Sequence, residues 1–310
     1  MRLIFLGKGG SGKTTLSSMF AMHCIRNGSK LLTIDGDVNI HLGMALRVPE
    51  NDLYLSNDYP ELFKALEGEH PYFIKTQIIP GCGSLPPSQW SNLISLDENN
   101  LILRKFTWKS KDHSWWHIKL GDYGAVHSGG DCYHFKQNAL ELFVHRINDS
   151  EFDIVMTDAT AGIDHLATSL VRAYDLCIFS VEPTTKSVSV AKDFLELSQK
   201  AKISVLFIAN KIDSEDDIKF ISQNLNYKIT GSIAHIEGLG YSESDEHEIL
   251  SQKSMNMEEL FKNIINVGAD CFKFRQKQLN ELALIYKKEC TGYWNSYSGI
   301  DLLPYLEGVE

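Results

Sequence analysis

The glycine-rich loop at residues 7–14 constrains the fold more than any other segment of the chain. Its sequence, GKGGSGKT, fits the pattern G-x4-G-K-[ST], in which backbone N–H groups and a helix N-terminus surround phosphate. An apolar run at 2–6 precedes the loop, and residues 14–27, with apolar side chains at helical spacing, follow it. A strand, a phosphate loop and a helix in this order predict a parallel βαβ unit.

Further apolar runs of strand length recur along the chain. They predict strands that are buried on both faces, at 30–34, 152–157, 175–181 and 203–209. The fold class we predict is α/β, with a doubly wound, mainly parallel sheet that carries helices on both faces. We expect one nucleotide-binding domain over 1–256 and a helical C-terminal extension over 257–310.

An insertion at about 50–135 interrupts this pattern. It holds four of the five tryptophans of the chain, namely Trp90, Trp108, Trp115 and Trp116. The runs 101–108 and 114–120 predict the two strands of a hairpin, which we place at the sheet edge. The insertion is either a surface for a protein partner or a subdomain that buries its own aromatic side chains, and we favour the second interpretation.

Charge and cysteine content exclude several classes of protein. The chain has 30 basic and 40 acidic residues, a net charge of -10, which argues against nucleic acid as a partner. No apolar run reaches the ~18 residues of a membrane span, so we predict no membrane anchor. The six cysteines are scattered without a C-x-x-C pair, which is typical of a cytoplasmic protein with reduced thiols.

The glycine loop predicts how a nucleoside triphosphate binds. We expect the phosphates to contact the loop residues Gly9, Gly10, Ser11, Gly12, Lys13, Thr14 and Thr15. Lys13 is expected to reach the β- and γ-phosphates, Thr14 to ligate Mg²⁺ through its hydroxyl, and Thr15 to contact the α-phosphate.

A second lysine, Lys8, lies in the same loop. The string GKGGSGKTT resembles the deviant Walker A motif, KGGxGK[ST], of the MinD/ParA/ArsA/nitrogenase-iron-protein group of P-loop ATPases, the SIMIBI class. In that group the early lysine crosses a dimer interface to the partner's phosphates. The resemblance therefore implies an ATP-dependent homodimer in which Lys8 is a catalytic residue acting in trans. The alternative is a solvated lysine on the loop.

Two acidic segments follow predicted strands near this loop. Asp35-Gly36-Asp37-Val38-Asn39 resembles the switch I segment D-x-D-x-[NQ] of the same group, which implies that Asp37 orients the hydrolytic water and Asp35 is an outer-shell Mg²⁺ partner. The group usually has proline where Val38 stands. Asp158 ends another strand, and we expect it to accept from Mg²⁺-bound water. We expect Gly162, four residues later, to donate its backbone N–H to the γ-phosphate.

Later segments narrow the resemblance. The run 158–166 is similar to that of CooC-type ATPases, which mature carbon monoxide dehydrogenase, and 182–187 is similar to their P-x-x-x-S segment. Asn210-Lys211-Ile212-Asp213 matches the guanine-binding motif N-K-x-D, but the related ATPases also place Asn-Lys here to contact adenine. We therefore predict that Asn210 and Lys211 bind the base of ATP, with GTP as the alternative.

A transition-metal site is a further hypothesis. CooC-like proteins carry a C-x-C motif ahead of switch II, where two protomers hold one metal ion. Here the matching stretch offers Cys132 and His134, one thiolate and one imidazole per chain, which suit Zn²⁺ or Ni²⁺ across a dimer. Ordinary packing is the alternative that we favour.

Three biological roles agree with these motifs. The first is a metallocentre-maturation ATPase that couples dimerisation to metal delivery. The second is a ParA/MinD-like positioning ATPase, although we find no basic or amphipathic terminal segment for it. The third is a nucleotide-switched regulatory or sensor subunit that binds an unidentified protein partner. An electron-transfer role is less expected, because Cys132 precedes Asp158 and the next cysteine, Cys177, lies within a strand pattern.

Overall fold

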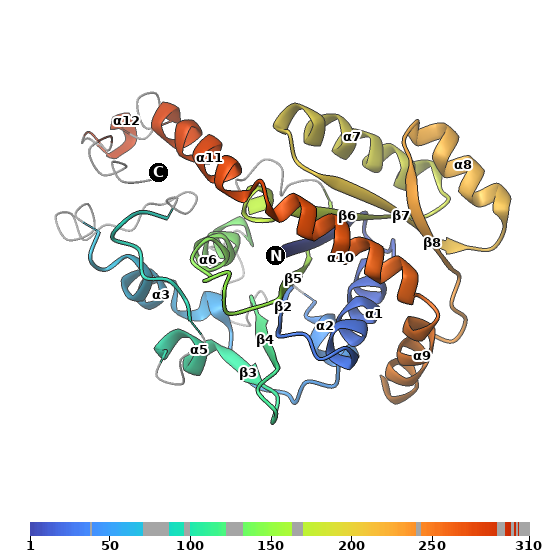
Figure 1. The fold of residues 1–310 in the computed structure, drawn as a ribbon, viewed down its shortest axis with the longest axis horizontal. Coiled ribbons are helices and arrows are strands. Elements are labelled where there is room, and N and C mark those ends of the chain that lie inside the picture. Colours follow the sequence, from blue (N-terminus) through green and yellow to red (C-terminus); the bar gives the residue numbers. More distant parts are fainter. Residues whose placement is uncertain are drawn as a thin grey trace.

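The computed structural model describes residues 1–37, 39–70, 87–95, 100–121, 133–162, 170–239, 243–289, 295–298, 301 and 303. Its centre is an eight-stranded sheet with the order β3-β4-β2-β5-β1-β6-β7-β8 (Figure 1). The strands are β1 Arg2–Gly7, β2 Leu31–Gly36, β3 Thr107–Lys109, β4 Trp115–Lys119, β5 Ile154–Ala159, β6 Leu176–Val181, β7 Val205–Ile212 and β8 Ile229–Ala234. β3 pairs antiparallel with β4, whereas the other neighbouring strands are parallel.

Helices cover both faces of this sheet. The helices are α1 Lys13–Arg26, α2 His41–Ala45, α3 Tyr59–Glu67, α5 Leu101–Phe106, α6 Tyr133–His145, α7 Thr185–Ala201, α8 Glu215–Leu225, α9 Glu243–Met255, α10 Glu258–Phe272, α11 Arg275–Glu289 and α12 Asn295–Ser298, with 3₁₀ turns η1 Leu55–Asp58 and η3 Leu170–Ala173. Alternate β1 side chains enter different cores: Ile4 packs with α3, α6, α7 and α8, and Phe5 with α1, α9 and α10. The predicted doubly wound α/β fold is confirmed.

The five predicted strands 2–6, 30–34, 152–157, 175–181 and 203–209 all occur, with their bounds displaced by at most three residues. β8 was not predicted. Its sequence, ITGSIA, is only half-buried because β8 lies at the end of the sheet, so it has no continuous apolar run.

The predicted strand at 101–108 is wrong over most of its length. The Asn100 side chain caps a short helix, α5, by accepting from the N–H groups of Ile102 and Leu103 at 3.1 and 3.2 Å. This local cap outweighs the strand propensity of the apolar run. A hairpin remains, but it consists of β3 and β4, and it lies at the sheet edge as predicted.

Two tryptophans of the insertion, Trp115 and Trp116, pack inward. Trp115 and Trp116 are 8% and 7% exposed, and the Trp115 indole donates to the Thr33 hydroxyl of β2 at 2.9 Å. Trp108 lies edge-on to Trp115, with ring centroids 4.8 Å apart. These contacts favour the interpretation of the insertion as a subdomain that buries its own aromatic side chains.

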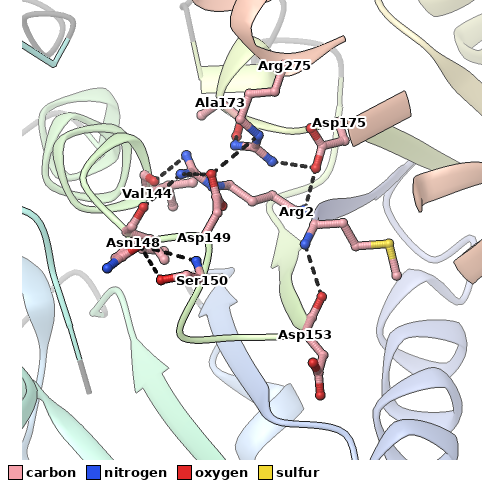
Figure 2. A network of polar contacts seen from close by, with 11 residues as sticks. Arg2, Val144, Asn148, Asp149, Ser150, Asp153, Ala173, Asp175 and Arg275 are labelled. Atoms are coloured by element: carbon pink, nitrogen blue, oxygen red, sulfur yellow. Dashed lines mark hydrogen bonds and ion pairs between the residues drawn. The ribbon is translucent and has the colours of Figure 1, made fainter. Parts of the chain in front are cut away.

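A polar network joins α11 to Arg2 at the start of β1, the strand whose other end leads into the glycine loop (Figure 2). The Arg2 guanidinium donates to the Val144 carbonyl at 2.7 Å and pairs with Asp149 at 2.8 Å. The Arg2 backbone N–H donates to the Asp175 carboxylate at 2.7 Å, and Arg275 of α11 binds the same carboxylate. α10 and α11 thus form the helical extension predicted after 257. None of the described helices is both long and apolar enough to cross a membrane.

A buried ion pair joins α6 to the insertion. Arg146 contacts Glu67 at the end of α3, and both side chains are completely buried. We predict that Arg146→Met lowers the free energy of unfolding by about 3–5 kcal/mol, because it leaves the Glu67 carboxylate buried without its counter-ion. Urea denaturation measures this loss. Lys200→Met, which breaks the exposed Lys200–Glu196 pair, is the matched control and should change stability by less than about 1 kcal/mol. Equal effects of the two substitutions would contradict the prediction.

Candidate functional site

The glycine loop lies between β1 and α1, at the carboxyl ends of the parallel strands. Gly10 and Gly12 adopt positive φ angles of 81° and 79°, which are unfavourable for residues with a Cβ atom. A Cβ on Gly12 would lie 2.2 Å from the amide nitrogen of Asn210 on β7. The glycine at this position is therefore required by the backbone conformation and by the close approach of Asn210.

The loop forms one wall of a cleft of about 560 Å³. Most of the predicted site residues line this cleft: Lys8, Gly9, Gly10, Ser11, Gly12, Lys13, Thr14, Thr15, Asp37, Asn210 and Lys211. The sequence indicated no role for Asn39 and His41 after β2, nor for the end of β8 and the segment that follows it, which contribute Ala234, His235, Ile236 and Leu239. That segment carries no motif, and only the parallel order of β7 and β8 brings it to the same edge.

A lysine, a hydroxyl and two carboxylates meet at the floor of the site. The Thr14 hydroxyl donates to Asp158 Oδ2 at 2.6 Å, and Lys13 Nζ lies 3.2 Å from Asp37 Oδ2 and 3.9 Å from Asp158 Oδ1. Asp158 is fully buried, and its Oδ1 accepts no hydrogen bond from the residues that the structure describes. Burial raises the pKa of Asp158, although Lys13 and Thr14 lower it. A buried, incompletely paired carboxylate beside a threonine hydroxyl fits a divalent cation.

Asp37 is held by its neighbour in the segment after β2. Asp37 Oδ1 accepts from the backbone N–H of Asn39 at 3.1 Å and from its side-chain amide at 3.0 Å. These contacts orient the carboxylate toward Lys13. The residues that the sequence assigned to water orientation and phosphate binding are therefore adjacent in space.

Asp35 has a different environment from Asp37. Its Oδ2 accepts from the N–H groups of Leu42 and Gly43, at 2.8 and 3.3 Å, at the start of α2. Asp35 and Asp158 are register partners on β2 and β5. Burial, and secondarily the charge of Asp158, raise the pKa of Asp35 to about 8. The visible role of Asp35 is to position α2, and its outer-shell role toward Mg²⁺ stays a prediction.

The raised pKa of Asp35 predicts a pH dependence of stability. Its folded-state pKa of about 8 exceeds the ordinary value of 3.8, so the folded protein holds a proton that the unfolded chain releases. The free energy of unfolding of the nucleotide-free protein should therefore fall as pH rises between these values, by up to about 1.4 kcal/mol per pH unit from this group. Asp35→Asn should flatten this slope in urea denaturation at pH 5 to 8. An unchanged slope would contradict the assignment.

Asn210 and Gly162 make contacts within the protein in this structure. The Asn210 amide donates to the carbonyls of Ser11 and Gly12 at 2.9 and 3.2 Å, so this residue supports the glycine loop from behind. The Gly162 N–H donates to the Gly7 carbonyl at 3.1 Å. Base contact by Asn210 and γ-phosphate contact by Gly162 stay predictions, and each requires these bonds to be exchanged for bonds to nucleotide.

Glu182, at the end of β6, is a charged residue of the site whose role the sequence did not indicate. Its two carboxylate oxygens lie 3.3 Å from Lys8 Nζ and 3.3 Å from Lys211 Nζ. Lys8 Nζ also donates to the Gly9 carbonyl at 2.9 Å. An acidic residue directly after a buried strand was the available signal, because the carboxyl ends of neighbouring parallel strands share one edge.

The hypothetical transition-metal site lies outside the described residues. Cys132 is not described, and neither is the side chain of His134. In the described part of the chain, no three His, Cys, Asp or Glu side chains gather in a way that could hold a metal ion. His145 is buried at the end of α6, where burial and Arg146 lower its pKa well below the ordinary range.

Comparisons with known proteins agree with this geometry. No family model matches the chain. An uncharacterized ATP-binding protein of Methanocaldococcus jannaschii is 25% identical over 234 residues, which are 73% of this chain and 84% of the relative. The carbon monoxide dehydrogenase accessory protein CooC of Rhodospirillum rubrum is 26% identical over 236 residues, 75% of this chain and 83% of that protein.

A solved structure shares the fold. The ParA family ATPase of Chlorobium tepidum superposes with a TM-score of 0.56 at 16% identity, covering 86% of this chain and 98% of that chain. The likeness to this structure therefore extends to the fold, the doubly wound sheet and the helices that cover it. The prediction of a P-loop ATPase that resembles the MinD, ParA and CooC proteins is confirmed.

Proposed function

We propose that this protein is a Mg²⁺-dependent ATPase that acts as a nucleotide-switched homodimer in metallocentre maturation. The observation that carries the proposal is the cluster in which Thr14 contacts Asp158 while Lys13 lies between Asp158 and Asp37. A phosphate loop alone supports nucleotide binding. The oriented carboxylate beside the loop lysine adds a group for hydrolysis.

The residues of the site divide the work of hydrolysis. The loop N–H groups and Lys13 bind the triphosphate and stabilise the charge that develops on the transferred phosphoryl group. The Thr14 hydroxyl and Asp158 are the groups that would hold Mg²⁺, which supplies further charge neutralisation when bound. Asp37, fixed by Asn39, orients the attacking water.

We propose ATP as the nucleotide. The related protein of M. jannaschii is named as ATP-binding, which supports adenine over guanine. Asp213, the residue that would pair with guanine, lies 3.4 Å from the His235 imidazole, and its side chain is 73% exposed. Competition between ATP and GTP for the purified protein tests this choice, and tighter binding of GTP would contradict it.

The maturation role rests on the CooC relative and on the CooC-like run at 158–166. In this role the delivered metal is cargo, Zn²⁺ or Ni²⁺, and Cys132 with His134 of each protomer would hold it between two chains. Such a protein acts on a client metalloenzyme, so a protein partner and a cytoplasmic location belong to the same proposal.

The test is the mass of the full chain with and without ATP and Mg²⁺, together with metal analysis of the dimer after incubation with Ni²⁺ or Zn²⁺. We expect a dimer only with nucleotide, and one metal ion per dimer that Cys132→Ser abolishes. A nucleotide-bound monomer would contradict the homodimer. A dimer without stoichiometric metal would contradict the maturation role and leave a regulatory subunit as the alternative.

A further inference from the structure

Glu182 is the one acidic side chain that the structure places against both of the outer lysines of the nucleotide site. One carboxylate oxygen lies 3.3 Å from Lys8 and the other lies 3.3 Å from Lys211. The Glu182 side chain is 13% exposed, whereas those of Lys8 and Lys211 are 31% and 43% exposed. A partly buried carboxylate is thus neutralised by two cations, one from the glycine loop and one from β7.

The local fold holds Glu182 in this position. It directly follows β6, the strand between β1, which leads into Lys8, and β7, which carries Lys211. The Glu182 backbone N–H donates to the Ser187 hydroxyl at 3.1 Å. The parallel pairing of β1, β6 and β7 therefore fixes the position of the Glu182 carboxylate relative to the two lysines.

Both lysines also bind the outside of the glycine loop. Lys8 donates to the Gly9 carbonyl and Lys211 to the Gly10 carbonyl. While these contacts hold, Lys8 is bound within its own protomer. Its proposed role in trans requires the Lys8 ammonium to leave Glu182 and to reach the phosphates bound by a second chain.

We propose that Glu182 is a positioning residue that restrains Lys8 in cis and opposes dimerisation until nucleotide is bound. The inference rests on the proposed ATP-dependent homodimer. In the dimer, the triphosphate of the second chain would replace Glu182 as the counter-ion of Lys8, whereas without nucleotide Lys8 would leave Glu182 with no replacement. The cost of breaking the Lys8–Glu182 pair is then part of the free energy of dimerisation.

The experiment compares dimer dissociation constants of the full chain in the presence of Mg²⁺ and saturating non-hydrolysable ATP analogue, by sedimentation. Glu182→Gln removes the charge at nearly constant volume and should tighten the dimer by roughly fivefold, the scale of one partly exposed ion pair. Glu196→Gln is the matched control, because it removes an exposed glutamate paired with Lys200 at 2.6 Å on α7. It should leave the constant unchanged.

A second lysine variant separates restraint of Lys8 from an effect through Lys211. In a Lys211→Met background, Glu182→Gln should still tighten the dimer, because Glu182 still pairs with Lys8 there. Glu182→Ala should act in the same direction as Glu182→Gln and serves if the glutamine variant unfolds. Both variants are checked by their thermal unfolding.

The outcomes distinguish the inference from the function on which it rests. If the wild type stays monomeric with the ATP analogue, the proposed homodimer falls and the inference falls with it. If the wild type dimerises and Glu182→Gln dimerises equally or more weakly, only the inference is overturned. Tightening that disappears in the Lys211→Met background would likewise overturn restraint through Lys8.

Discussion

Asp37→Ala is expected to lower the rate of ATP hydrolysis by about 10²–10⁴-fold, the usual contribution of a positioned acid-base group, without weakening ATP binding. The physical reason is the location of this carboxylate. It lies 3.2 Å from Lys13 and is fixed by two hydrogen bonds from Asn39, so its loss removes the group that orients water. Binding should persist because the loop N–H groups and Lys13 remain, and Lys13 is freed from a competing anion.

Phosphate release at saturating ATP measures the rate, and titration calorimetry with a non-hydrolysable analogue measures the affinity. Asp216→Ala, which removes an exposed carboxylate paired with Lys219 at 2.9 Å on α8, is the matched control and should leave both unchanged. If Asp37→Ala loses binding and hydrolysis in equal proportion, Asp37 contributes to ground-state binding, and its assignment to water orientation is wrong.

Lys8→Ala is expected to abolish ATP-induced dimerisation and to reduce hydrolysis by about 10³-fold. This is the lower range found for a cation that is supplied to a phosphoryl-transfer site from a second chain. The loop itself should stay intact, because the Asn210 amide still donates to the carbonyls of Ser11 and Gly12. ATP affinity of the monomer is therefore expected to change little.

Sedimentation with and without ATP analogue, followed by a hydrolysis assay over a range of protein concentrations, checks both parts of this prediction. For the wild type, the rate per chain should rise with protein concentration, since the active species is a dimer. Lys200→Ala, at an exposed position on α7, controls for the loss of a positive charge. Full hydrolysis by a Lys8→Ala monomer would overturn the mechanism in trans.

The strands of the sheet were predictable because their side chains are buried on both faces. A strand such as Ile154–Ala159 is buried at every position, and this leaves a run of mainly apolar residues in the sequence. Edge elements lack that constraint. β8 is half-buried and was missed, and the apolar run at 101–108 was assigned to a strand although Asn100 caps a helix there.

The candidate site was predictable in part. Gly7 to Thr15, Asp37 and Asp158 belong to local motifs whose spacing reflects contacts with one phosphate chain, so they could be recognised without the fold. The contacts of Asn210 and Asp35 could not be predicted from the sequence. The Asn210 amide donates to the backbone carbonyls of Ser11 and Gly12, which are distant from it in sequence. The Asp35 carboxylate accepts from a backbone N–H at the start of α2, which lies beyond the motif.

The sequence by itself determined that this protein has a phosphate loop with two lysines, acidic residues after its buried strands and a doubly wound sheet. These are properties of short segments, in which local backbone conformation and burial act on neighbouring residues. Only the tertiary structure decided which charges meet. Glu182 contacts Lys8 and Lys211 because β6 lies between β1 and β7, and strand order depends on the packing of the whole chain.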